Sequence, residues 1–71
     1  MTDLDSRLLA AHAAGDHVAL VELYREAADR AASVDAACFY LTQAYVFALE
    51  RGHMAAPALR ARLVAQGREP A

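Results

Sequence analysis

The sequence contains no lysine, asparagine, isoleucine or tryptophan, and only one cysteine, two prolines and three glycines. A single cysteine excludes an internal disulfide framework and a zinc site built from several thiolates. A net charge of −2 provides no general attraction to nucleic acid or to anionic lipid. With 71 residues, the chain forms one domain at most and is too short for a dinucleotide-binding or barrel domain.

Long apolar runs are also missing. The longest stretch without a charged residue runs from Ala36 to Leu49, which is 14 residues, whereas a membrane-spanning helix needs about 20. Asp3 and Asp5 precede any apolar run, which is unlike a secretory signal. The lone Cys38 suits a reducing compartment. We therefore expect a cytoplasmic protein without a membrane contact.

The composition that remains favours helices. The chain is 58% hydrophobic and has 19 alanines, so it is too apolar for disorder and rich in a strong helix former. Each glycine follows a helix-like segment, at the place where helices end in a left-handed residue. Asp16 can cap one helix, Ser33 or Asp35 another, and Pro57 fits a first helical turn. We predict four helices, over residues 3–14, 17–32, 36–51 and 55–66.

The predicted fold class is all-α. Turns of about two to four residues make successive helices antiparallel, so the chain would form two stacked helical hairpins. The single domain would cover residues 1–71, with hairpin one over about 3–32, hairpin two over about 35–66, and a tail over 67–71. Helix 36–51 is apolar nearly all round, which is typical of a central helix. The alternative is a helix that continues through Ser33, which would favour an extended dimer instead.

Two of the glycines are 37 residues apart, a period typical of helical repeats. The chain resembles the tetratricopeptide-repeat (TPR) superfamily. Gly15 matches the turn of the first unit, Tyr24 the large aromatic residue of its second helix, and Ala27 a small packing residue. Leu41 and Tyr45 match the leucine and tyrosine of the first helix of the second unit. Because only part of the repeat motif is present, we describe the chain as TPR-like.

The departures from the motif are the missing tryptophan and five substituted positions, namely Arg7, Leu8, Ala11, Ala32 and Pro57. The resemblance implies a scaffold without catalytic residues, which binds a peptide or protein segment on a concave face. The first helix of each unit lines that face in the family. Here those helices are residues 3–14 and 36–51.

Four short helices cannot enclose every side of helix 36–51, so large apolar side chains should remain partly exposed, as at an interface. We predict a groove that binds a protein or peptide helix there. Its residues are Phe39, Tyr40, Val46 and Phe47 as anchors, with Thr42 and Gln43 as polar contacts. Tyr24 and Tyr45 are expected to face each other in the core. The alternative is a homodimer that buries the same face between two copies.

No motif predicts an enzyme, and we expect no catalytic residue, cofactor, metal or small-molecule substrate. The turn histidines lack the i, i+4 spacing of paired helical metal ligands, so exposed turn residues are favoured over a shared metal or pH-sensitive site. Glu22 and Glu26 predict a solvated charged face, with Glu26 and Arg30 as an i, i+4 pair. Cys38 is expected to be a buried small hydrophobe. The histidines are His12, His17 and His53.

Charge is unevenly distributed along the chain. Residues 1–50 carry three arginines and eight acidic residues, a net −5, whereas residues 51–71 carry four arginines and one acidic residue, a net +3. A basic end could bind phosphate through Arg60, Arg62 and Arg68, as in a nucleic-acid-associated regulator. Because Arg60 and Arg62 are two residues apart and do not share a helix face, nucleic-acid binding is disfavoured. The asymmetry could instead orient two copies head to tail or attract an acidic partner.

Overall fold

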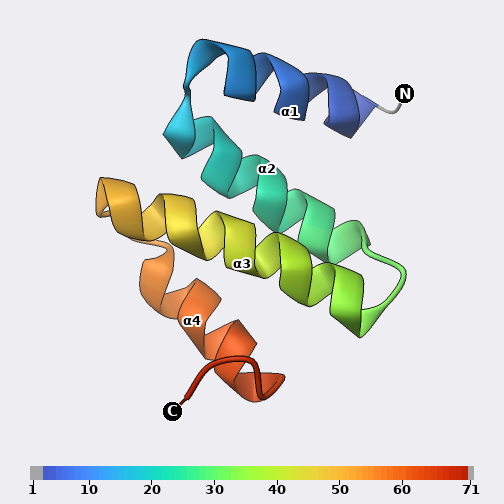
Figure 1. The fold of residues 1–71 in the computed structure, drawn as a ribbon, viewed down its shortest axis with the longest axis vertical. Helices are drawn as coiled ribbons and strands as arrows, with labels where there is room; N and C mark the ends of the chain where they lie inside the picture. Colours follow the sequence, from blue (N-terminus) through green and yellow to red (C-terminus); the bar gives the residue numbers. More distant parts are fainter. Residues whose placement is uncertain (1–2, 71) are drawn as a thin grey trace.

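The computed structural model describes residues 3–70, which form four α-helices and no strand (Figure 1). These are α1 (Asp3–Ala14), α2 (His17–Arg30), α3 (Val34–Arg51) and α4 (Ala56–Ala65). The all-α prediction with four helices is confirmed, and every helix end lies within two residues of its predicted position. Residues 1, 2 and 71 of the predicted domain and tail lie outside the described part.

Local capping groups explain where the helices begin and end. The side chain of Asp16 accepts a hydrogen bond from the backbone N–H of Ala19 at 3.1 Å and so caps α2. Gly52 ends α3 with φ +59°, a left-handed conformation that glycine adopts at least cost. The N–H of His53 then donates to the carbonyl of Ala48 at 2.8 Å. Pro57 lies in the first turn of α4, as predicted.

A non-helical segment separates α2 from α3, so the two helices do not form one continuous helix. Ala31 adopts an extended conformation with ψ 143°, which ends α2 two residues earlier than predicted. Ser33 then accepts a hydrogen bond from the N–H of Ala36 at 3.1 Å, and α3 begins at Val34 instead of Ala36. The two residues that follow α2, Ala31 and Ala32, are alanines, and neither is a glycine or proline that would end a helix. Their conformation therefore follows from the turn that returns α3 onto α2.

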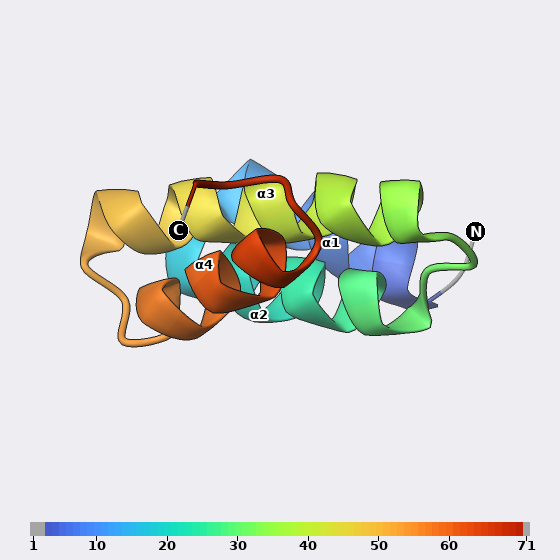
Figure 2. The same ribbon diagram turned by 90° about the horizontal axis from the view of Figure 1, so that it is seen from below.

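The four helices lie side by side in chain order, and within residues 3–70 each backbone packs only against its neighbours along the chain (Figure 1). The array is flat, with extents of 34 × 29 × 12 Å. Figure 2 shows α3 in one layer, with α2 and α4 in a second layer beneath it. The most extensive helix–helix interface joins α2 to α3 and thus connects the two predicted hairpins.

The hydrophobic core lies between α2, α3 and α4. Alanines on α2 and α3 allow the two backbones to approach closely, and leucines of α4 close the other side. Helix α1 adds Leu4 and Ala11 where it packs on α2. The residues of the central cluster are Val21, Ala28, Cys38, Leu41, Ala44, Ala48, Ala55, Leu59 and Leu63.

Candidate protein-binding surface

Helix α3 carries an apolar stripe on its solvent-exposed side. Phe39 is 58% exposed, Val46 43% and Leu49 57%, and Thr42 between them is also exposed. These four residues, called the α3 stripe below, follow one another at intervals of three, four and three positions. Because that spacing keeps side chains on one side of an α-helix, they form a continuous strip about three turns long. The hydroxyl of Thr42 donates to the carbonyl of Cys38 at 2.8 Å and is satisfied within the helix.

Two hollows lie along the α3 stripe, one near each end. The first has a volume of about 390 Å³ and the second about 280 Å³. In both, the second wall comes from α4 or from the segment after it, and not from α1 as expected. The first is lined by Asp35, Cys38, Phe39, Thr42, Gln43 and Arg68, and the second by Tyr45, Leu49, Ala56, Pro57 and Arg60.

An arginine lies at the outer wall of each hollow. Arg68 donates to the carboxylate of Asp35 at 2.5 Å, and this hydrogen bond raises the pKa of the Arg68 guanidinium. Arg60 donates to the backbone carbonyl of Pro70 at 2.6 Å. These two bonds hold the C-terminal segment against α3 and α4, so the segment forms part of the wall.

The structure divides the six predicted binding residues into two groups. Phe39, Thr42 and Val46 belong to the α3 stripe, and half-buried Gln43 lines the first hollow. Tyr40 and Phe47 are half-buried and pack against the core cluster instead. They share a different side of α3, the one that faces α2, because they are seven residues apart and offset from Phe39 by about a quarter turn.

An aromatic cluster joins α2 to α3 on that side. The ring of Tyr24 stacks on those of Tyr40 and Phe47, with centroid distances of 6.2 and 6.1 Å. Tyr24 and Tyr45 both pack against the core cluster, as predicted. The prediction that they face each other is wrong, because Tyr45 lies beside α4 and lines the second hollow. Burial, and secondarily Tyr40, raises the pKa of Tyr24 above its ordinary value. Stacked aromatic rings contribute specific geometry as well as buried area to this interface.

The predicted binding set omits Leu49, Arg60 and Arg68. The interval from Val46 to Leu49 continues the spacing of Phe39, Thr42 and Val46, so the sequence pattern could have identified Leu49. The charge asymmetry of the sequence identified the two arginines as part of a basic end, but it did not place them beside α3. Their position beside α3 depends on how α4 and the following segment fold back.

The three histidines have different hydrogen-bond partners. His12 Nε2 lies 2.9 Å from the Tyr24 hydroxyl, and His17 Nδ1 accepts from Arg51 Nε at 3.0 Å. His53 Nδ1 accepts from the backbone N–H of Ala55 at 3.0 Å. Within residues 3–70 no group of three His, Cys, Asp or Glu side chains could hold a metal ion. The favoured interpretation as exposed turn residues is wrong for two of them. His17 is half-buried at the start of α2, and the side chain of His53 is only 15% exposed.

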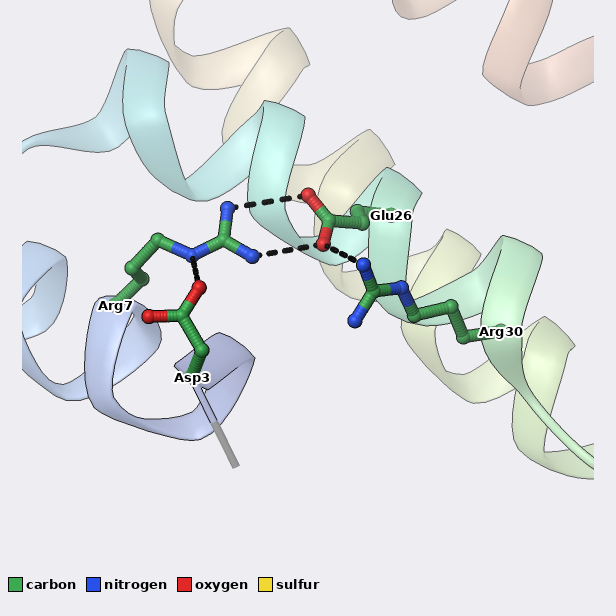
Figure 3. A network of polar contacts seen from close by, with 4 residues as sticks. All are labelled: Asp3, Arg7, Glu26 and Arg30. Atoms are coloured by element: carbon green, nitrogen blue, oxygen red, sulfur yellow. Dashed lines mark hydrogen bonds and ion pairs between the residues drawn. The ribbon is translucent and has the colours of Figure 1, made fainter. Parts of the chain in front are cut away.

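The acidic residues of α2 take part in ion pairs. Both terminal nitrogens of Arg7 in α1 donate hydrogen bonds to the Glu26 carboxylate, at 3.2 and 2.8 Å (Figure 3). Asp3 lies 2.9 Å from Arg7 Nε, and the predicted pair of Glu26 with Arg30 is present at 3.0 Å. Hydrogen bonds from Arg7 hold the pKa of Glu26 below its ordinary value. This network connects α1 to α2 and leaves Glu26 fully occupied as a structural group.

The basic end of the sequence pairs largely within the molecule. Arg62 of α4 bonds the Asp29 carboxylate of α2 at 2.9 Å, and Arg68 bonds Asp35 of α3. The fold places residues 51–70 next to the acidic helices, so much of the charge asymmetry is neutralised internally. Arg60 differs because the partner it bonds, the Pro70 carbonyl, is uncharged.

A further hollow of about 450 Å³ lies between α1 and α2. Its floor consists mainly of alanine methyl groups, and Leu23 is the one large apolar side chain that lines it. A partner would find few anchoring contacts there, because binding energy concentrates in large side chains that fill pockets. The α3 stripe is therefore the stronger candidate surface.

No protein-family model, curated protein or solved structure matches the chain. Over residues 3–70, none of the helices combines the length and the apolar character needed to cross a membrane.

Proposed function

We propose that this protein is a small non-catalytic interaction module that binds an α-helical segment of a partner on the α3 stripe. The observation that carries the proposal is the exposure of Phe39, Val46 and Leu49 in one line on the central helix. Exposed apolar strips of this kind mark interaction sites. A spacing of three and four residues matches the apolar seam of another helix.

The proposed architecture is TPR-like. The two helical hairpins pack on each other through α2 and α3, which supports this interpretation, because helical-repeat arrays are built from units that stack on their neighbours. Helix α3 is the first helix of the second unit, the helix that the resemblance assigns to ligand binding. The proposed groove departs from the family expectation in using α4 as its second wall. We also propose a cytoplasmic location, which suits the free thiol of Cys38.

A homodimer is the second candidate. The spacing of the α3 stripe is the same in both directions, so two antiparallel copies could align stripe against stripe. Light scattering after size-exclusion chromatography distinguishes the two candidates, because a dimer has twice the 7.6 kDa mass of one chain. Nucleic-acid binding is less well supported, because Arg62 and Arg68 are paired with Asp29 and Asp35.

The experiment is a selection of helical peptides from a displayed library on the immobilised full chain. We expect enriched peptides with apolar residues at intervals of three and four, and a loss of binding of at least about tenfold with Phe39→Asp. Leu9→Asp is the matched control, because Leu9 is 59% exposed but lies on α1. If no peptide is enriched, or if the enriched peptides bind Phe39→Asp equally well, the proposed function is wrong.

A further inference from the structure

The geometry points to one kind of occupant for the α3 stripe, an amphipathic helix whose flank facing α4 carries acidic residues. This inference rests on the proposed function and specifies the chemistry of its partner. The argument depends on the charged groups at the two edges of the stripe. Arg60 lies on the α4 edge beside Leu49, and Arg68 borders the hollow at the Phe39 end. Glu50 is one residue beyond Leu49, so its side chain lies on the side of the stripe away from α4.

Arg60 is the group best placed to bind a partner's carboxylate. It borders the hollow that contains Leu49, and its hydrogen-bond acceptor in the structure is the neutral carbonyl of Pro70. A carboxylate forms a stronger, charge-assisted bond with a guanidinium than a neutral carbonyl does. When the partner helix binds, one of its apolar residues contacts Leu49. A carboxylate next to that residue would replace the Pro70 carbonyl as the acceptor for Arg60 and form a stronger bond.

The α3 stripe defines the length of the matching segment. Phe39 is ten residues from Leu49 along α3. Ten residues of α-helix span about 15 Å, or roughly three turns. The partner helix that fits carries apolar residues over three turns, with an acidic residue on the α4 flank at the end that contacts Leu49. Arg68, at the Phe39 end, is already paired with Asp35 and contributes little to this preference.

The opposite edge favours a different residue type. Glu50 is exposed there, so a lysine or arginine on the second flank of the partner would be matched and an acidic residue would be repelled. Unlike flanks on the two sides of an apolar seam also determine the direction in which a helix binds. Arg62 takes no part, because it pairs with Asp29 of α2.

The test uses two fluorescein-labelled amphipathic peptides with the same apolar seam. One carries glutamates on the flank that faces α4, and the other carries lysines at those positions. Fluorescence anisotropy with the full chain should show the acidic peptide binding at least about tenfold more tightly at low salt, with a smaller ratio at high salt. Arg60→Glu should reverse this preference, and Arg60→Gln should bring the ratio of the two affinities close to one.

The control for net charge is Arg30→Glu. Arg30 lies on α2 with its side chain 63% exposed, so this variant has the same change in charge away from the stripe and should retain the preference. Equal affinities of the two peptides, both lost with Phe39→Asp, would overturn the acidic partner but leave the interaction module intact. If the protein is a dimer and Phe39→Asp converts it to a monomer, the acidic partner is also overturned, because a second copy of the chain then occupies the α3 stripe. Binding of neither peptide to a monomeric chain would contradict both proposals.

Discussion

Two phenylalanines on α3 have opposite roles at the scale of single residues. Phe39 is 58% exposed, and its ring lies edge-on to that of Tyr40, with a centroid distance of 5.5 Å. Phe47 is half-buried among three rings, with centroid distances of 6.1 Å to His12, 5.3 Å to His17 and 6.1 Å to Tyr24. A charge at position 39 therefore remains in water, whereas a charge at position 47 must be desolvated against aromatic rings.

We expect Phe39→Asp to change the free energy of unfolding by no more than about 0.5 kcal/mol, as is usual for exposed positions. Phe47→Asp should reduce it by at least about 2 kcal/mol, because it removes ring packing and places a carboxylate beside Tyr24. Urea denaturation followed by circular dichroism measures both values. An equal loss for the two variants would show that Phe39 is buried, and it could not then anchor a partner.

At the scale of single helices, stability depends on end groups and on contacts between neighbours. The break before α3 is set by one side chain, since Ser33 caps the N–H of Ala36. The attachment of α1 to α2 includes a bidentate ion pair between Arg7 and Glu26, besides the burial of Leu4 and Ala11 (Figure 3). Both features are partly exposed to solvent, so each should contribute modestly.

Ser33→Ala removes the cap of α3 and leaves one N–H of its first turn without that acceptor. We expect the free energy of unfolding to fall by about 1 kcal/mol, the typical cost of losing an N-cap side chain. Ser33→Asp retains an acceptor oxygen and should restore most of the loss. Thermal denaturation of the three proteins tests this, and an unchanged transition for Ser33→Ala would contradict the assigned cap.

The lowered pKa of Glu26 predicts a dependence of stability on pH. Because Arg7 holds the carboxylate in its charged form, the contribution of Glu26 is present above its ordinary pKa of about 4.3. It is lost as the pH falls through the lowered pKa of the folded state. Urea denaturation from pH 7 to pH 2 should therefore show a smaller acid-induced loss in Glu26→Gln than in the wild type. Glu50→Gln, at an exposed position of α3, is the control and should follow the wild type.

At the scale of the whole molecule, the protein is a row of helices and not a closed bundle. The backbones of α2 and α3 each have two helical neighbours, whereas among the described helices the backbone of α1 packs on α2. Only Leu4 and Ala11 of α1 are buried, while α4 contributes Leu59 and Leu63 to the central cluster. An arrangement of this kind opens first at its weakest end.

We expect amide hydrogen exchange to be faster in α1 than in the central residues of α2 and α3. Glu26→Gln should accelerate exchange in α1 while leaving the central part of α3 unchanged, because the Arg7 contact acts only at the α1–α2 interface. Mass spectrometry of peptic fragments resolves these regions. Equal exchange rates in α1 and α3 would indicate that the four helices open as one cooperative unit.

The sequence by itself determined the four helices and most of their ends. Alanine content, the glycines after α1, α3 and α4 and the caps at Asp16 and Ser33 act within a few residues, so they can be recognised without a fold. The end of α2 has no such signal and followed from the turn onto α3. The pair of Glu26 with Arg30 was predictable for the same reason. The central position of α3 also followed from its sequence, because a helix that is apolar nearly all round must be covered on several sides.

Only the tertiary structure decided which side of α3 faces solvent. An all-round apolar helix has no single stripe in its sequence pattern, so the docking of α2 and α4 selects the sides that are covered. In this packing the rings of Tyr40 and Phe47 stack on Tyr24, Tyr45 lies beside α4, and Leu49 remains exposed. The positions of Arg60 and Arg68 depend on the same packing, because contacts between distant segments exist only once the helices have assembled.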